Sequence, residues 1–66
     1  MPIIRVEMLA GRSIEQKRAF AQSVTNTASE ILGCSREAVA VVFDEVEPTD
    51  WANGGRLQSD ISAEGS

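Results

Sequence analysis

The sequence contains no histidine, no tyrosine and a single cysteine, Cys34. A lone cysteine excludes an intrachain disulfide, and without histidine it cannot complete a zinc site. The absence of histidine also excludes Ser-His and Cys-His nucleophile pairs. No glycine pattern typical of a phosphate-binding loop or a dinucleotide-binding turn is present. We therefore expect neither a metal site nor a cofactor.

Basic residues are also few, since six Lys and Arg stand against ten Asp and Glu and give a formal net charge of −4 at pH 7. Because no basic tract exists, we expect no nucleic-acid binding. The longest apolar run, residues 38–43, is too short to span a bilayer, so we expect no membrane association. No secretory signal is visible, and with a free thiol the expected location is cytoplasmic.

The length of 66 residues allows one domain. We expect it to cover residues 1–66, with a flexible tail over about 61–66. Folding must offset roughly 1.5 kcal/mol of conformational entropy per ordered residue, and a core this small leaves little net stability. With a disulfide and a metal excluded, self-association is the leading explanation for stability.

Two segments have the pattern of β-strands. Residues 2–9 mostly alternate between an apolar face and a second face, which predicts a half-buried strand. Residues 38–43 are rich in β-branched side chains and apolar on both faces, which suggests a central strand. The acidic segment 44–50 contains Pro48, and we expect it to be a loop.

Between these strands the sequence predicts one helix of about 19 residues. Ser13 and Gln16 have the spacing of a capping box, and Gly33 is a natural terminator. The apolar stripe of this helix has spacings of four and three: Phe20, Val24, Ala28 and Ile31.

The expected fold class is therefore α/β: one β-α-β unit with parallel strands. Residues 51–57 contain Asn-Gly and Gly-Gly, which predicts a tight turn or a short C-terminal hairpin. A two-stranded sheet cannot stand alone, and one helix covers only one of its faces. The other face, with Ala38, Ala40 and Val42 or their alternates, would stay bare. We expect copies of the chain to pair edges and stack faces into an oligomer.

Pro2 directly follows the initiator methionine. Removal of Met1 would expose a secondary amine at the start of the first strand. The pKa of an α-amino group is about 7.7 to 8.0; burial and a nearby cation would both lower the pKa of the more basic prolyl amine. Such a nitrogen can exchange a proton near neutral pH, as general acid-base catalysis requires. On this residue alone, the plainer interpretation that Pro2 only begins a strand is favoured.

Three segments together resemble the 4-oxalocrotonate tautomerase family over roughly residues 2–60: residues 2–4, 8–18 and 50–55. The most specific element is the amino-terminal proline at a fixed distance from the block Gly-Arg-Ser-x-Glu-Gln-Lys that begins at Gly11. The resemblance implies a hexamer of β-α-β subunits, usually a trimer of dimers. It also implies proton transfer in 2-hydroxydienoate or similar enol carboxylates, without a metal or cofactor.

The resemblance further implies a role for four residues. Pro2, after loss of Met1, is the catalytic base that moves the enol proton to carbon. Arg12 binds the substrate carboxylate, a task that suits a planar guanidinium. Trp51 lines the pocket wall, and the backbone of Leu9 lines the site. Taken alone, Arg12 also fits a surface residue and Trp51 a packing anchor.

One departure from the family bears on the substrate. Well-studied members carry a second arginine where this sequence has Ala40, so a dicarboxylate substrate is less well supported than a monocarboxylate such as an arylpyruvate enol. Arg36, in the preceding loop, is the alternative cation, although a surface role fits it better. Related dehalogenases need a carboxylate where this chain has Asn53, so a tautomerase is favoured. A promiscuous hydratase or dehalogenase and a non-catalytic oligomeric module are the alternatives.

Overall fold

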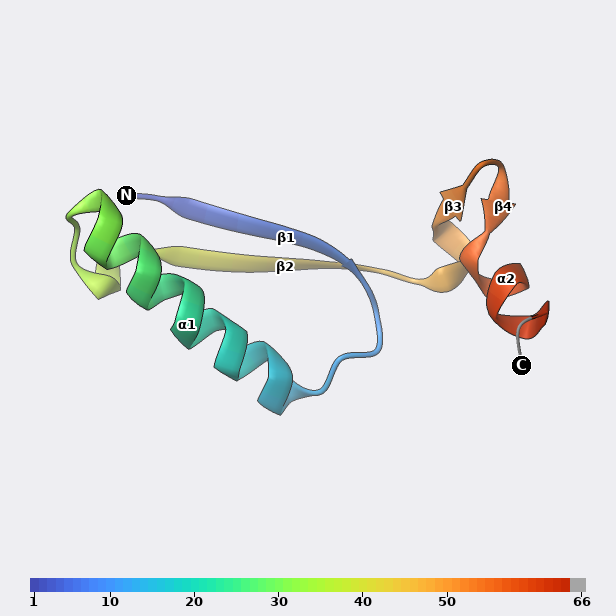
Figure 1. Cartoon of the computed structure of the whole chain (residues 1–66), viewed down its shortest axis with the longest axis horizontal. Coiled ribbons are helices and arrows are strands. Elements are labelled where there is room, and N and C mark those ends of the chain that lie inside the picture. Colours follow the sequence, from blue (N-terminus) through green and yellow to red (C-terminus); the bar gives the residue numbers. More distant parts are fainter. Residues whose placement is uncertain (65–66) are drawn as a thin grey trace.

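The computed structural model describes residues 1–64, and its elements form a β-α-β unit followed by a small C-terminal unit (Figure 1). Each strand and helix has defined bounds: β1 (Ile3–Leu9), α1 (Ile14–Leu32), the 3-10 helix η1 (Arg36–Ala38), β2 (Ala40–Val46), the 3-10 helix η2 (Pro48–Asp50), β3 (Ala52–Asn53), β4 (Arg56–Leu57) and α2 (Gln58–Glu64). β1 and β2 pair in parallel, and β3 and β4 pair antiparallel. The predicted fold class is thus confirmed.

Both ends of α1 are fixed by local interactions. The backbone N–H of Gln16 donates to the Ser13 hydroxyl at 3.1 Å, and the backbone N–H of Ser13 donates to Gln16 Oε1 at 2.9 Å. This reciprocal pair satisfies two backbone donors that the first helical turn would otherwise leave free. At the other end Gly33 has a φ of 73°, a left-handed conformation that favours glycine. The predicted helix and both of its end signals are confirmed.

The second strand lies further along the chain than the sequence predicted. The predicted strand covered residues 38–43, whereas Ala38 belongs to η1 and β2 covers Ala40–Val46. The register of the parallel sheet runs from Ile3 opposite Ala40 to Leu9 opposite Val46. β2 therefore continues through residues 44–46, and the prediction of a loop from residue 44 is wrong there. The reason is pairing: the last three residues of β1 offer partners for these positions, and ladder hydrogen bonds do not depend on the acidic side chains.

The C-terminal unit begins after β2 and contains the predicted hairpin. Gly54 and Gly55 have φ values of 59° and 81°, which is the requirement of a type I′ turn between β3 and β4. α2 then continues through Glu64, where the sequence predicted a flexible tail from about residue 61. The remainder of that predicted tail, residues 65–66, lies outside the described residues.

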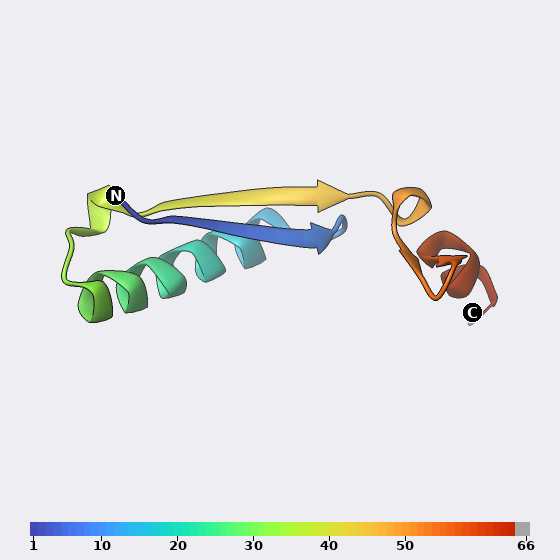
Figure 2. The same cartoon turned by 90° about the horizontal axis from the view of Figure 1, so that it is seen from above.

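α1 covers one face of the parallel sheet, and the other face is open (Figure 2). Alternate residues of β1 and β2 are half-buried beneath α1, and the Phe20 and Phe43 rings meet there with centroids 6.1 Å apart. On the opposite face Ile3 is 67% exposed and Val42 is 39% exposed. The expectation of a bare face is confirmed for Ala40 and Val42, but it is wrong for Ala38, which is half-buried in η1 before β2 begins.

The single chain has no hydrophobic core, since no residue in its described part is buried. α1 itself leaves large apolar side chains in solvent: Ile31 is 76% exposed and Ile14 is 65% exposed. Ser29, which is not part of the predicted apolar stripe, is half-buried. The face of α1 that meets the sheet is therefore rotated about the helix axis relative to the predicted stripe. The apolar surface of α1 is wider than one two-stranded sheet can cover, and its burial requires a further surface.

This missing core predicts that stability depends on protein concentration. If folding is coupled to association of copies, a hundredfold rise in concentration should stabilise the folded state by about 2.7 kcal/mol per association step. Urea unfolding followed by circular dichroism at several concentrations measures this as a rising midpoint. A midpoint that is independent of concentration would show that one chain is stable by itself.

Candidate active site

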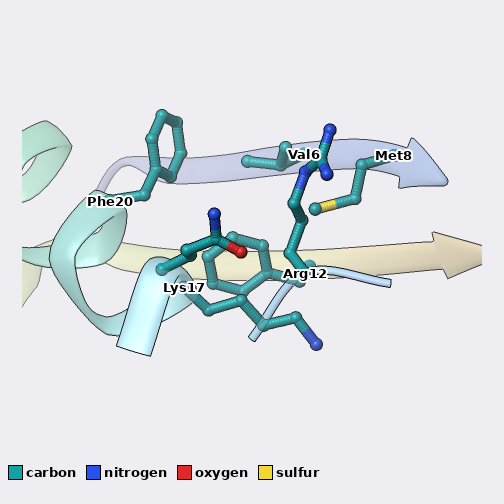
Figure 3. Close-up of a pocket in the computed structure, with 7 residues that line it drawn as sticks. Val6, Met8, Arg12, Lys17 and Phe20 are labelled. Carbon is teal, nitrogen blue, oxygen red and sulfur yellow. The ribbon is translucent and has the colours of Figure 1, made fainter. Parts of the chain in front are cut away.

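A pocket of about 250 Å³ lies between the start of α1 and the second half of β1 (Figure 3). Its wall combines four apolar side chains with three polar ones: Val6, Met8, Phe20 and Phe43, with Arg12, Gln16 and Lys17. The capping box at the start of α1 begins at Ser13, directly after Arg12. The cap therefore fixes the position of the Arg12 backbone relative to the first turn of α1. The pocket is therefore an apolar cavity with a cationic rim.

Arg12 stands on the short loop that joins β1 to α1. The preceding Gly11 has a φ of 128°, a conformation that side-chain-bearing residues rarely adopt, and this turn directs the loop back over the sheet. Figure 3 shows the Arg12 side chain extending across the pocket toward Met8. Within residues 1–64 no carboxylate forms an ion pair with Arg12. Its guanidinium N–H donors are thus available to an incoming anion.

Lys17 is the second cation of the pocket, but its charge is offset. It forms an ion pair with Glu45 of β2, and the two side chains are only 25% and 33% exposed. Glu45 alternates to the same side of β2 as Phe43, in the part of the strand where the sequence predicted a loop. Arg12 is consequently the pocket cation whose charge is left uncompensated.

Pro2 directly precedes β1, whereas Arg12 follows the other end of this strand. Figure 1 shows the N-terminus and the loop between β1 and α1 at opposite ends of β1. Its carbonyl accepts a hydrogen bond from the Ala40 N–H at 3.0 Å, and its nitrogen is acylated by Met1, which is 94% exposed. The seven residues of β1 alone span roughly 23 Å at 3.3 Å per residue. A single chain therefore does not bring Pro2 and Arg12 together.

The other two predicted site residues also lie outside the pocket lining. Leu9 ends β1 opposite Val46, and its side chain alternates to the face away from α1. Trp51 follows η2 in the C-terminal unit, where its Nε1 donates to Asn53 Oδ1 at 2.9 Å and its carbonyl accepts from the Gln58 N–H. Leu9 and Arg12 are thus near one end of the sheet, and Trp51 lies beyond it.

Sequence reasoning missed the aromatic wall of the pocket and its paired lysine. Arg12, Gln16 and Phe20 recur every four residues, and this spacing would have placed them on one side of the helix start. Phe43 gave no such signal, because its position depends on the register of β2 against β1. The same register determines which carboxylate meets Lys17.

Ala40 occupies the position beside Pro2. It stands opposite Ile3 in the register, and its N–H is the donor to the Pro2 carbonyl. Its methyl group supplies no charge there. Arg36, in η1 just before β2, is exposed. Within one chain, β2 thus supplies no cation beside Pro2 at the position of the family's second arginine.

The described residues contain no group of three or more His, Cys, Asp or Glu side chains able to hold a metal ion. Across this same part of the chain, neither α-helix is long and apolar enough to cross a membrane.

The chain matches the family model described as tautomerase enzyme over residues 2–61. A protein of Bacillus cereus named a probable tautomerase is 42% identical over 60 residues, which cover 91% of this chain and 98% of that protein. The crystal structure of TomN, a 4-oxalocrotonate tautomerase homologue in the tomaymycin biosynthetic pathway, is 40% identical with a TM-score of 0.89, and the match covers 98% of this chain and 100% of that chain.

A further solved relative is a heterohexameric 4-oxalocrotonate tautomerase from Chloroflexus aurantiacus. It is 33% identical with a TM-score of 0.85, and the match covers 92% of this chain and 98% of that chain. Fold, motif and family model agree along nearly the whole sequence. The chain belongs to the tautomerase family, as the resemblance of its three segments predicted.

Proposed function

We propose that this chain is a cofactor-free enol-keto tautomerase, in which Pro2 is the general acid/base and Arg12 of another copy binds the substrate carboxylate. The observation that carries the proposal is an unpaired Arg12 guanidinium at the rim of an apolar pocket in a tautomerase-family chain. A carboxylate bound there would form charge-assisted hydrogen bonds next to surface that excludes water.

The complete site requires two copies, because Pro2 and Arg12 lie at opposite ends of β1. The outer edge of β1 is unpaired within the described residues, since the sheet order is β1-β2. Two copies that pair these edges in antiparallel orientation bring the start of one β1 beside the end of the other. Two-fold symmetry then creates two equivalent sites per dimer.

We take this dimer as the building block of a homohexamer. The heterohexameric relative supports an assembly of this size, and the absence of buried residues in one chain supports association in general. In such an assembly the backbone of Leu9 would accompany Arg12 at the site, and Trp51 would close the pocket wall from a neighbouring copy. A cytoplasmic location completes the proposal.

The chemistry follows from a free prolyl amine. Removal of Met1 converts the Pro2 nitrogen from an amide to a secondary amine. The amine accepts the hydroxyl proton of the enol as the carbonyl forms, and the resulting ammonium donates a proton to the substrate carbon, which restores the amine. In the two-copy site, apolar surface and the Arg12 guanidinium would both disfavour the protonated amine.

The charges of the pocket favour a monocarboxylate with an apolar or aromatic tail, such as an arylpyruvate enol. Arg12 is uncompensated, Lys17 is paired with Glu45, and position 40 carries a methyl group. A second carboxylate would lose hydration without gaining a cation. The Phe20 and Phe43 rings instead offer contact area to an aryl group.

Substitution of either proposed residue tests the proposal. On Met-free protein, Pro2→Ala and Arg12→Ala should each lower kcat/KM for ketonisation of phenylenolpyruvate by about 100-fold, measured as the loss of enol absorbance. Arg18→Ala is the matched control, since Arg18 is exposed on α1. Equal rates in wild type and both variants would refute the proposal. A Met-free wild type without activity would favour the non-catalytic module, so mass spectrometry of the chain accompanies the assay.

Mixing the two inactive variants tests whether the site is shared between copies. When Pro2→Ala and Arg12→Ala chains are unfolded together and refolded at equal amounts, sites that combine an intact Pro2 with an intact Arg12 should form in about a quarter of positions. Activity should recover to that fraction of the wild-type rate. No recovery in assemblies that contain both chains, as verified by native mass spectrometry, would assign both residues to the same chain.

Restoring a cation beside Pro2 tests the substrate class. Ala40→Arg should raise kcat/KM for a 2-hydroxymuconate-type dicarboxylate, relative to phenylenolpyruvate, by about tenfold or more, because a charged hydrogen bond contributes about 1.5 to 3 kcal/mol. Ala40→Gln controls for side-chain length without the charge. An unchanged ratio of the two kcat/KM values would contradict the charge argument.

A further inference from the structure

The pocket beneath α1 is lined by two cations that differ in their partners. Within the described residues, Glu45 forms an ion pair with Lys17, and no carboxylate forms one with Arg12. In Figure 3 the Arg12 guanidinium lies near Val6 and Met8, whereas the Lys17 side chain extends away from it. Two cations and one carboxylate leave a single positive charge at the pocket. The pocket therefore has the charge to bind one carboxylate.

Both members of the ion pair are held in place by regular secondary structure. The Lys17 N–H donates to the Ser13 carbonyl at 3.1 Å, so its backbone is fixed in the first turn of α1. Glu45 stands opposite Met8 in the parallel register, on the strand beside the one that supplies Val6 and Met8 to the pocket. Glu45 itself is not one of the lining residues. Any effect of this carboxylate on a ligand therefore acts through Lys17.

We propose, building on the tautomerase function proposed above, that Glu45 is a positioning residue that determines substrate specificity. Its carboxylate holds the Lys17 ammonium and prevents the pocket from accepting a second carboxylate. A dicarboxylate would either displace Glu45 from Lys17 or bury its second charge without a cation. Displacement leaves Glu45 unpaired beside an incoming anion, which repels it. A monocarboxylate requires Arg12 alone and encounters neither penalty.

The surroundings of Lys17 show why the partner carboxylate matters. Lys17 lies near the N-terminus of α1, whose partial positive charge disfavours a cation, and Arg12 lines the same pocket. A Lys17 released from Glu45 would therefore attract an anion strongly. An ion pair that only joined α1 to β2 would have a different effect, because its loss would weaken the fold for every substrate alike. The choice between substrates thus separates the two roles.

Variants that change the charge of the pocket test the inference on Met-free protein. Glu45→Gln releases Lys17 and should raise kcat/KM for a 2-hydroxymuconate-type dicarboxylate, relative to phenylenolpyruvate, by about tenfold, mainly through a lower KM. Lys17→Met leaves Glu45 unpaired and should lower this ratio below the wild-type value. The double variant retains only the charge of Arg12, so its ratio should return to the wild-type value.

Asp44→Asn is the matched control. It removes the preceding carboxylate of β2, which alternates to the other side of the strand, and should leave the ratio unchanged. Any loss of stability or assembly affects both substrates and cancels in the ratio. An unchanged ratio in Glu45→Gln would overturn the inference, as would an equal rise in the double variant that lacks Lys17.

Binding of two unreactive acids separates the inference from the proposed catalysis. In calorimetric titrations, Glu45→Gln should bind adipate about tenfold more tightly relative to phenylacetate than wild type does. An inactive wild type that shows this difference would refute the tautomerase proposal and support the role of Glu45. If circular dichroism shows that Glu45→Gln does not fold, a weaker relative affinity of Lys17→Met for adipate is the supporting result. Equal affinity ratios in wild type and the folded variants, or no binding of either acid, would overturn the inference.

Discussion

One helix over a two-stranded sheet cannot remove its own apolar side chains from water, and this constraint governs the whole molecule. Capping and ladder hydrogen bonds define α1, β1 and β2, yet Ile31 and Ile3 remain 76% and 67% exposed. Local interactions thus specify the shape of the subunit, while contacts between subunits must supply its hydrophobic stabilisation. The same architecture separates Pro2 from Arg12, so the proposed two-copy site needs a neighbouring subunit just as the stability of the chain does.

The elements that the sequence predicted well are those with local signals. The Ser13 cap and the left-handed Gly33 each mark one end of α1 through interactions between residues close in sequence. The adjacent glycines of the C-terminal hairpin likewise define its turn. The end of β2 was missed, because pairing with β1 extends the strand through Val46 in spite of an acidic segment. The rotation of α1 was also missed, since it depends on packing against a sheet whose register the sequence does not state.

The site could be predicted only in its parts. Arg12, which lines the pocket, was predicted as a site residue from its motif, and its place next to the start of α1 follows from the cap at Ser13. The aromatic wall at Phe43 and the ion pair between Lys17 and Glu45 arise from the strand register, so no short-range pattern reveals them. The distance between Arg12 and Pro2 likewise follows from the extended geometry of β1. This distance can be estimated only once residues 3–9 are known to form one continuous strand.

Terminal residues usually fray, but the second residue of this chain is anchored. Its carbonyl is held by the Ala40 amide, and its pyrrolidine ring fixes the backbone torsion that would otherwise rotate. In the proposed reaction, a prolyl nitrogen restrained in this way would have little orientational freedom to lose when the substrate arrives. Strand pairing would then give it the preorganisation that other enzymes obtain by embedding a reactive group in a rigid interior.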